Sequence, residues 1–221
     1  MALPVPKTLD AALFDLGGVF IDSPFEAAEL ASDELGADPI QVLEVVFGPY
    51  HDDTDHPWHR LERAEISLED ARVEIIALGE AAGIDADPYR VLGALAQSAG
   101  VREPMVERVR TLRRAGVRTA LVTNNIKEFR EGWLALLPFD ELFDLLVDSS
   151  ELGIRKPNPA IFEHTLRELG GVAPSNAIFL DDYEGNITAA EKLGIHGILV
   201  GYDPTEAIGV LDAVIESTVG S

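Results

Sequence analysis

Short apolar runs alternate with amphipathic segments along most of the chain. Each run leads into polar or glycine-rich residues, as where Ala11-Ala12-Leu13-Phe14 leads into Asp15. Uninterrupted apolar runs of this length are typical of buried parallel strands, and the amphipathic segments between them are typical of helices that cover a sheet. We therefore expect an α/β fold with a doubly wound, Rossmann-like parallel sheet. The predicted strands are 11–14, 119–123, 144–148, 177–181 and 197–200, and the predicted helices are 104–115, 126–137, 159–169 and 187–193.

The alternation stops after the first strand. From residue 25 to about residue 99 the sequence favours helices alone. One helix begins at Phe25, and Ser67-Leu68-Glu69-Asp70 resembles a capping box that opens another. Further helices are expected at 39–46 and 88–96.

This interruption predicts two domains. We expect an α/β core domain formed by residues 1–22 and 100–221, and a helical cap domain formed by residues 23–99. An insertion at the end of the first strand would lie over the carboxyl edge of the sheet, where open α/β folds bind their ligands.

The chain is strongly acidic. It has 221 residues, of which 47% are apolar, and a formal net charge of −22. The apolar content is ample for a hydrophobic core. An acidic surface repels nucleic acid and anionic lipid, so we expect neither as a partner. An anionic substrate would need local positive charge from a metal ion or a lysine.

Other features of the composition exclude several classes of chemistry. The chain contains no Cys, which excludes disulfides and thiolate catalysis. The N-terminus lacks the apolar stretch of a signal peptide, and no segment reaches the roughly 18 uninterrupted apolar residues of a membrane helix. These features predict a cytoplasmic protein. The sequence does not indicate the oligomeric state.

Polar residues suited to phosphate chemistry follow the predicted strands. Asp15 follows the first strand, Thr123-Asn124-Asn125 ends the second, and Asp181-Asp182 ends the fourth. Lys156, one of only four lysines, precedes a Pro-Asn-Pro turn between them. Because the carboxyl ends of parallel strands meet at one edge, a carboxylate, a hydroxyl, an ammonium group and an acidic pair are expected to converge there.

These four segments, in this order, resemble the motifs of the haloacid dehalogenase-like (HAD) hydrolase superfamily. A helical cap after the first motif resembles its subgroup with a small cap of the C1 type. Ser23-Pro24-Phe25, the segment 58–67 and the Asp-Asp-x-x-x-Asn pattern at 181–186 are similar to the phosphatase-like N-terminal domain of soluble epoxide hydrolases.

The resemblance implies a role for each motif. It implies that Asp15 is a nucleophile that forms an aspartyl phosphate, which splits hydrolysis into two easier steps. It also implies that Thr123, Asn124 and Lys156 bind the phosphate and stabilise its charge, with help from the amide groups of Asn125. The helix expected from about Ile126 would point the positive end of its dipole at the anion.

The resemblance further implies a Mg²⁺ ion. Its protein ligands would be the Asp15 carboxylate, the carbonyl of Gly17 and Asp182, supported by Asp181 and Asn186. Mg²⁺ favours hard oxygen ligands. A divalent ion also removes the repulsion between adjacent carboxylates.

One position departs from the resemblance. Phosphatases of this superfamily usually carry an Asp two residues after the nucleophile, as general acid for the leaving group, and Gly17 stands there instead. A general acid typically contributes ~10²–10⁴ in rate. Three consequences are open: a leaving group that needs little protonation, such as an anomeric or acyl phosphate; a donor from the cap or from water; or a weak or non-catalytic relative.

The leading hypothesis is a Mg²⁺-dependent phosphatase that acts on a small phosphorylated metabolite. The alternatives are a haloacid dehalogenase, in which Asp15 attacks carbon, and a non-catalytic phosphate-binding protein. The acidic pair Asp181-Asp182 argues against the dehalogenase, whose chemistry needs no metal ion.

The segment 48–60, rich in Asp, His and Pro, is expected to be a loop. Its histidines, His51, His56 and His59, are irregularly spaced, which does not fit a zinc site. We interpret them as solvent-exposed, and Trp58 as an anchor of the cap.

Overall fold

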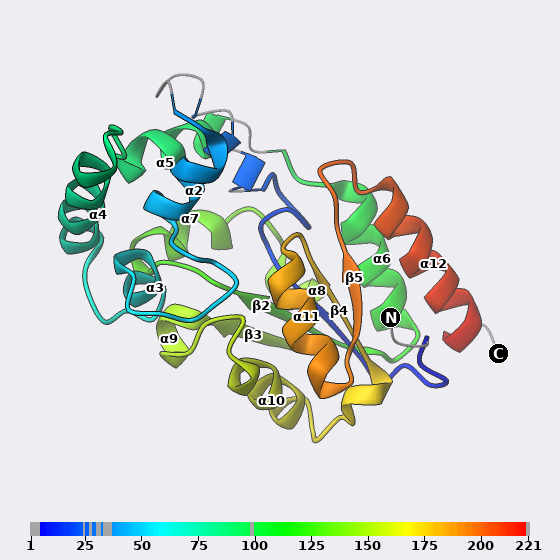
Figure 1. Cartoon of the computed structure of the whole chain (residues 1–221). Helices are drawn as coiled ribbons and strands as arrows, with labels where there is room; N and C mark the ends of the chain where they lie inside the picture. Colours follow the sequence, from blue (N-terminus) through cyan, green and yellow to red (C-terminus); the bar gives the residue numbers. More distant parts are fainter. Residues whose placement is uncertain are drawn as a thin grey trace.

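The structure is a computed structural model that describes residues 5–23, 25, 26, 28, 29, 32, 37–97 and 100–219. Its centre is a sheet of five parallel strands in the order β3-β2-β1-β4-β5. This sheet and the helical insertion that follows β1 confirm the predicted fold class (Figure 1). The strands are β1 (Ala11–Phe14), β2 (Arg118–Thr123), β3 (Leu145–Asp148), β4 (Ala177–Asp181) and β5 (His196–Leu199).

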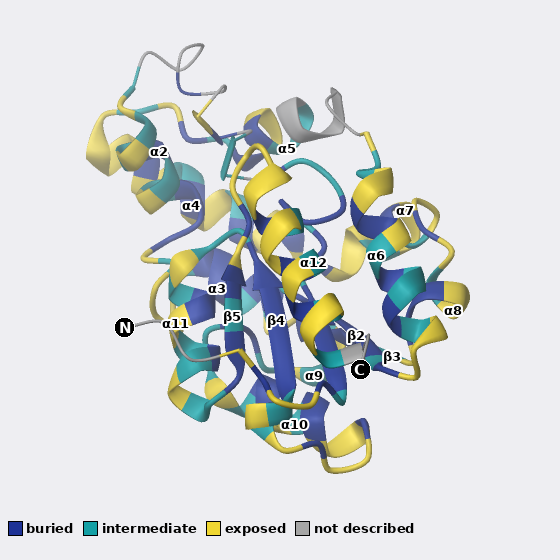
Figure 2. Cartoon of the chain, turned by 90° about the vertical axis from the view of Figure 1, so that its right-hand side faces the viewer, coloured by how far each residue is buried: buried dark blue, intermediate teal, exposed yellow. Residues whose placement is uncertain are grey.

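Helices cover both faces of the sheet. Helices α6 (Glu103–Arg114) and α12 (Thr205–Val219) pack side by side on one face. Helices α10 (Pro159–Glu168) and α11 (Glu184–Leu193) cover the other. Alternate residues of β1 point to opposite faces, so Phe14 belongs to the first core cluster and Leu13 to the second. Figure 2 shows the strands buried between these layers.

The predicted strands agree with the structure to within about one residue, but one predicted helix was wrong. In place of a helix over 126–137 the chain forms a 3₁₀ turn, η1 (Lys127–Phe129), and a short helix, α7 (Arg130–Leu134). Gly132 in its middle disfavours a longer helix. The short helices α8 (Phe139–Leu142) and α9 (Ser149–Leu152), the 3₁₀ turn η2 (Pro174–Asn176) and helix α12 were not predicted.

The insertion contains its own hydrophobic cluster. Ile75, Leu61 and Trp58 are buried in it. Residues 25, 26, 28, 29 and 32 are helical, and the rest of the helix expected from Phe25 lies outside the described residues. The other helices of the insertion are α2 (Pro39–Val46), α3 (Pro57–Glu62), α4 (Leu68–Ala82) and α5 (Pro88–Gln97).

Local sequence signals explain two of these helices. Ser67 and Asp70 form the predicted capping box at the start of α4, and Gly83 ends that helix in the left-handed conformation. The loop predicted for 48–60 was wrong at its end, where α3 begins. Pro57 occupies the first turn of α3, and the His56 ring accepts a hydrogen bond from the Trp58 amide.

A buried ion pair joins the insertion to the core. The Arg155 guanidinium donates to Glu62 Oε2 at 2.6 Å, and the two side chains are only 0% and 3% exposed. Glu62 Oε1 accepts hydrogen bonds from Trp58 Nε1 at 2.8 Å and from the Tyr50 hydroxyl at 3.0 Å. The hydroxyl of Ser149, at the start of α9, donates to the carbonyl of Glu62. These contacts fix α3 against the core near the ends of β2 and β3.

Among the helices of the described residues, none is both long and apolar enough to cross a lipid bilayer.

We predict that Arg155→Met lowers the free energy of unfolding by about 3–5 kcal/mol, because it leaves Glu62 buried without its charge partner. The control is Arg60→Met, which breaks the Arg60–Glu74 pair on the surface of the insertion. These side chains are partly exposed, so we expect a loss of under ~1 kcal/mol. Urea unfolding measures both, and equal losses would show that burial of the Arg155–Glu62 pair has no energetic consequence.

Candidate active site

The site begins at the centre of the sheet. Asp15 is the first residue after β1, and its amide donates to the carbonyl of Leu180 on β4 at 2.9 Å. Asp15 Oδ1 accepts a hydrogen bond from the amide of Leu16 at 2.7 Å, which fixes the carboxylate over the turn. Because β1 is the middle strand, Asp15 lies between the ends of β2 and β4.

A buried lysine connects two carboxylates. Lys156 Nζ lies 2.9 Å from Asp15 Oδ1 and 2.7 Å from Asp181 Oδ2, and the lysine side chain is fully buried. Burial alone would lower the pKa of Lys156, but the charges of Asp15 and Asp181 outweigh it and raise the pKa. The ammonium group therefore stays charged.

The side chain of Asn124 holds the main chain of Lys156. Asn124 Oδ1 accepts from the Lys156 amide at 2.7 Å, and Asn124 Nδ2 donates to the Lys156 carbonyl at 3.0 Å. Asn124 Nδ2 also donates to the Tyr50 hydroxyl at 3.3 Å. The Asn124 side chain is thus engaged in positioning the lysine.

Thr123 and Asn125 lie on either side of Asn124 in the chain. Thr123 is the buried last residue of β2, beside the end of β1. The Asn125 amide donates to the Ser149 hydroxyl at 3.0 Å, and its side chain donates to Asp148 at 3.1 Å. The expected helix at Ile126 is replaced by the 3₁₀ turn η1, which offers a much weaker dipole than a long helix.

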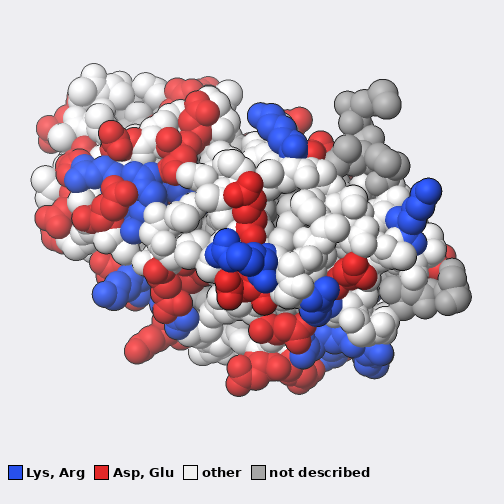
Figure 3. Space-filling model, turned by 90° about the horizontal axis from the view of Figure 1, so that it is seen from below, with Lys and Arg blue, Asp and Glu red and all other residues white. Residues whose placement is uncertain are grey.

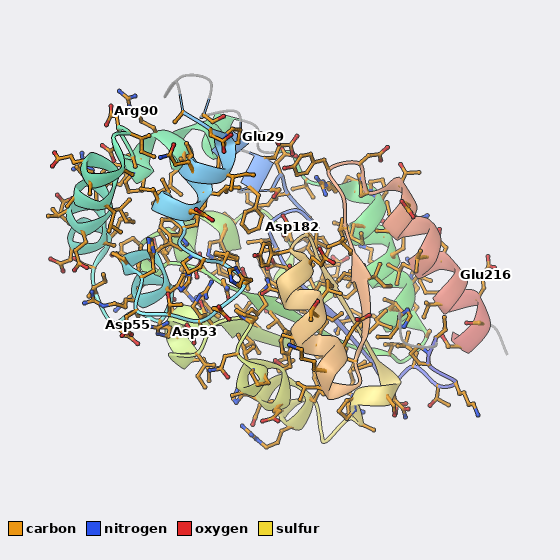
Figure 4. The ribbon with its side chains drawn as sticks, viewed as in Figure 1. Glu29, Asp53, Asp55, Arg90, Asp182 and Glu216 are labelled. Carbon is orange, nitrogen blue, oxygen red and sulfur yellow. The ribbon has the colours of Figure 1, made fainter. Side chains whose placement is uncertain are left out.

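Three carboxylates gather at the end of β4. Oxygen atoms of Asp15, Asp181 and Asp182 all lie within 4.8 Å of one another. Asn186 Nδ2 donates to both oxygens of Asp181 at 3.1 Å, so Asp181 is fully engaged with Asn186 and Lys156. The Ser23 hydroxyl donates to Asp182 Oδ2 at 2.5 Å. Figure 4 shows Asp182 between the sheet and the insertion.

Crowding and burial raise the pKa of two of these groups. Burial, and then the charge of Asp181, raise the pKa of Asp15 to about 7 although Lys156 opposes them. Burial and the charges of Asp181 and Asp15 raise the pKa of Asp182 well above its usual value. The cluster holds more negative charge than Lys156 neutralises. Its oxygen donors are the ligands that Mg²⁺ favours, so the residues fit this ion.

The turn after Asp15 depends on a glycine. Gly18 has a φ of +67°, and a Cβ atom added to it would overlap the Asp182 carboxylate. The Arg102 guanidinium donates to the carbonyl of Gly18. The main chain at Gly18 therefore packs against Asp182 at a distance that only glycine permits.

Residues 9–194 match the model of the haloacid dehalogenase-like hydrolase family. The chain belongs to this family. The match confirms the resemblance seen in the sequence. The structure of a HAD family enzyme from Bacteroides thetaiotaomicron, in complex with magnesium and inorganic phosphate, superposes with a TM-score of 0.59 at 20% identity and covers 88% of this chain and 96% of that chain. This likeness shows a shared fold.

Relatives of this HAD-like hydrolase include larger proteins. Mouse acyl-CoA dehydrogenase family member 10 is 32% identical over 213 residues, which are 95% of this chain but 19% of that protein. Mouse bifunctional epoxide hydrolase 2 is 26% identical over 93% of this chain and 39% of that protein. A sesquiterpene phosphatase of Aspergillus oryzae is 26% identical over 86% of this chain and 89% of its own length. The chain thus spans well under half of the two mouse proteins.

The interpretation of the loop histidines of this HAD-like hydrolase was wrong for His59 and His56. His59 is fully buried and His56 is half-buried, and burial lowers their pKa values to about 3 and about 4. Their rings stay neutral and serve the packing of the insertion. His51 is exposed beside Asp52. Trp58 anchors the insertion as expected, since it is buried and donates to Glu62.

Several residues at the site were not assigned a role from the sequence. Ser23, Tyr50, Glu62 and Arg155 act through partners that are distant along the chain, and no local pattern marks such contacts. Only the turn at Gly17-Gly18 gave a local signal, because paired glycines after a strand indicate a tight approach of the main chain.

The raised pKa of Asp15 predicts a pH-dependent stability of the metal-free protein. The folded state keeps a proton up to about pH 7 that an unfolded Asp releases near pH 3.8. The contribution of this proton to the free energy of unfolding is complete below pH 3.8, and it is lost as the pH rises through 7. In EDTA, the stability of the wild type relative to Asp15→Asn should therefore fall between pH 5 and pH 8.

Urea unfolding of both proteins measures this difference. His56 and His59, whose pKa values are lowered, act in the opposite direction but are present in both proteins, so the comparison removes them. Parallel pH profiles of the two proteins would contradict a raised pKa at Asp15.

Gly18→Ala is expected to displace Asp182. Gly153→Ala is a matched control, because Gly153 has a similar φ of +72° but open space where a Cβ atom would lie. Both variants carry the strain of the left-handed conformation, about 1–2 kcal/mol. Gly18→Ala should lose clearly more stability and should also lose metal affinity, as measured by urea unfolding with and without Mg²⁺. Equal behaviour of the two variants would show that Gly18 is needed for its backbone conformation alone.

Proposed function

We propose that this protein is a Mg²⁺-dependent phosphatase that hydrolyses a small phosphate monoester through an aspartyl phosphate on Asp15. The observation that carries the proposal is the position of Lys156 Nζ, which contacts both Asp15 and Asp181 next to a third carboxylate. The phosphatase among the relatives, and the related enzyme in complex with magnesium and phosphate, support it.

In this proposal the residues of the chain divide the work. Asp15 attacks the phosphorus atom in line with the departing oxygen. Lys156 stabilises the negative charge of the phosphoryl group while it is transferred. The Thr123 hydroxyl donates to a phosphoryl oxygen from the end of β2. Asn124 keeps Lys156 in place through its main chain.

The Mg²⁺ ion would be held by Asp15, the carbonyl of Gly17 and Asp182, with Asp181 and Asn186 behind them. When bound, the ion offsets the repulsion between the carboxylates and the phosphate. Ser23 orients Asp182 through its hydroxyl.

We also propose the domain division given above, with a core of residues 1–22 and 100–221 and a cap of residues 23–99. A hydrophobic cluster formed by the insertion, which Ile126 alone joins from the core among its buried members, supports this division. The cap would cover the substrate at the carboxyl edge of the sheet.

The charge of the molecule favours a small-molecule substrate over nucleic acid or a membrane surface. The net charge is −22, and on the face seen in Figure 3 most basic side chains lie beside acidic ones. Salt bridges in the structure include Arg108 with Asp212 and Arg110 with Glu141. Nucleic acid and anionic lipid require a basic surface.

A dehalogenase remains the alternative within the same fold. It would use Asp15 to attack carbon and would release halide. The cluster of three carboxylates favours the phosphatase, because a bound metal ion would offset their mutual repulsion and the dehalogenase needs no such ion. A phosphate-binding protein without catalysis is the alternative from another class, and it is motivated by Gly17.

Phosphate release from a panel of phosphomonoesters tests the proposed function. We expect release with Mg²⁺, none with EDTA, and a loss of about 10³-fold or more in Asp15→Asn, which lacks the nucleophile. Asp140→Asn, at an exposed position of α8, is the control and should match the wild type. Halide release that is independent of Mg²⁺ would favour the dehalogenase, and phosphate binding without turnover would favour the binding protein.

A further inference from the structure

A cavity of about 120 Å³ lies between the insertion and the core. Aromatic and aliphatic side chains line most of it. An apolar protein cavity of roughly 150 Å³ is known to hold benzene, so this one suits a single small ring, especially since it opens to solvent. The apolar lining includes Phe25, Phe47, Tyr50, Trp58, Leu92 and Phe129.

Two residues of the cavity lining, Asn124 and Phe25, are linked by hydrogen bonds to the candidate catalytic groups. Asn124, which lines it, holds the main chain of Lys156. The amide of Phe25 donates to the Ser23 hydroxyl, which in turn donates to Asp182. The Phe25 ring also stacks on Tyr183, the residue after Asp182, with ring centres 5.2 Å apart. Hydrogen bonds through Asn124 to Lys156, and through Phe25 and Ser23 to Asp182, therefore connect the cavity with the candidate catalytic groups.

The polar side chains in the lining are already engaged within the protein. Glu62 accepts from Arg155, Trp58 and Tyr50. Asn124 is bound to Lys156, and Asn125 donates to Asp148. Among the lining residues that the structure describes, there is no Lys, Arg or His. A carboxylate or a second phosphate on the substrate would find no cation there, and burying it unpaired is costly.

Among the described residues of this lining, none is a good proton donor for a departing oxygen. Gly17 has no side chain. The Tyr50 hydroxyl donates to Glu62, and burial, followed by the charge of Glu62, raises its pKa well above the usual value, which makes it a poor acid. Glu62 only accepts hydrogen bonds from its neighbours. A leaving oxygen that gains no proton from these residues departs as an anion, which favours a stable one. A phenolate, whose acid has a pKa of about 10, leaves far more readily than an alkoxide, whose acid has a pKa close to that of water and far above that of a phenol.

We propose that the substrate is the monophosphate ester of a small phenol, whose ring occupies this cavity. The proposal rests on the proposed phosphatase function and names its substrate class. The size and apolar lining of the cavity select the ring, and the missing proton donor selects the phenolic oxygen.

The reaction balances without a general acid. Asp15 Oδ attacks phosphorus, the bond from phosphorus to the aryl oxygen breaks, and the phenolate leaves with the electron pair. Water then attacks the phosphorus of the aspartyl phosphate, which releases phosphate and restores the Asp15 carboxylate. One proton from that water neutralises the phenolate. The sum is one aryl phosphate and one water giving one phenol and one hydrogen phosphate.

Four phosphorylated compounds separate the effect of the ring from that of the leaving group. Phenyl phosphate has both the ring and the good leaving group, benzyl phosphate has the ring and a poor one, acetyl phosphate has a good leaving group and no ring, and ethyl phosphate has neither. With Mg²⁺, kcat/KM for phenyl phosphate should exceed that for benzyl phosphate by about 10²-fold or more, because a general acid is worth that much where it is needed. Acetyl phosphate should show a higher KM than phenyl phosphate.

Binding of phosphonates tests the cavity without turnover, because their carbon–phosphorus bond is not cleaved. By calorimetry with Mg²⁺, phenylphosphonate should bind wild-type protein about tenfold or more tighter than methylphosphonate. The reason is that burial of a ring of this size stabilises the complex by the free energy that corresponds to such a ratio of affinities. Phe129→Ala, at the rim of the cavity, should reduce this ratio. Leu136→Ala is the matched control, because Leu136 is 38% exposed, similar to Phe129 at 40%, and does not belong to the lining.

The outcomes separate this inference from the proposed function. If phosphate release depends on Mg²⁺ and Asp15 but benzyl phosphate matches phenyl phosphate, or phenylphosphonate binds no tighter than methylphosphonate, the substrate class is wrong and the phosphatase stands. If no ester is hydrolysed, or release persists in Asp15→Asn, both proposals fall. Both proposals would be supported if phenyl phosphate is preferred over benzyl phosphate and phenylphosphonate over methylphosphonate. The preference between the phosphonates should be reduced by Phe129→Ala and not by Leu136→Ala.

Discussion

Three carboxylates meet a single buried ammonium group at the carboxyl edge of the sheet, and the site depends on this imbalance of charge. Lys156 contacts Asp15 and Asp181, while Asp182 accepts a hydrogen bond from the hydroxyl of Ser23. In a buried site such charges interact more strongly than in water. The close approach of the three acids is enforced by the parallel strands and by the glycine turn after Asp15. A cluster with this charge favours a further cation over the metal-free state.

The insertion and the core are linked by the same hydrogen bonds that hold the lysine. Tyr50 comes from the insertion and accepts from Asn124, whose side chain also grips the Lys156 main chain. Tyr50 then donates to Glu62, which pairs with Arg155, the residue before Lys156. The walls of the cavity and the position of the lysine are therefore parts of one connected network.

The sequence was informative wherever a property is local. Apolar runs marked the five strands, and the first polar residue after β1 marked Asp15, because strand ends meet at one edge whatever the rest of the chain does. The capping box at Ser67 was visible for the same reason. Helix α12 also carries a local signal, because its buried residues Ala207, Leu211 and Val214 recur at helical spacing.

What the sequence did not reveal depends on contacts between distant segments. The burial of His59 follows from the packing of α3 against its neighbours, and an Asp- and His-rich segment gives no sign of it. Asn124 follows the end of a strand, where a phosphate ligand is expected. Its side chain instead bonds the main chain of Lys156, which lies 32 positions further along the chain. Pairing of Glu62 with Arg155 spans 93 positions, which no local pattern encodes.

That long-range pair has an implication for how such proteins diversify. Glu62, the acceptor, lies in the insertion and the Arg155 guanidinium lies in the core, so each part supplies the charge partner of a residue buried in the other. A chimera that carried a foreign insertion onto this core would strand Arg155 in an apolar interior unless the new segment offered a carboxylate at the same place. Exchange of insertions between such proteins is consequently constrained at the position of Glu62, even where the surrounding helices vary.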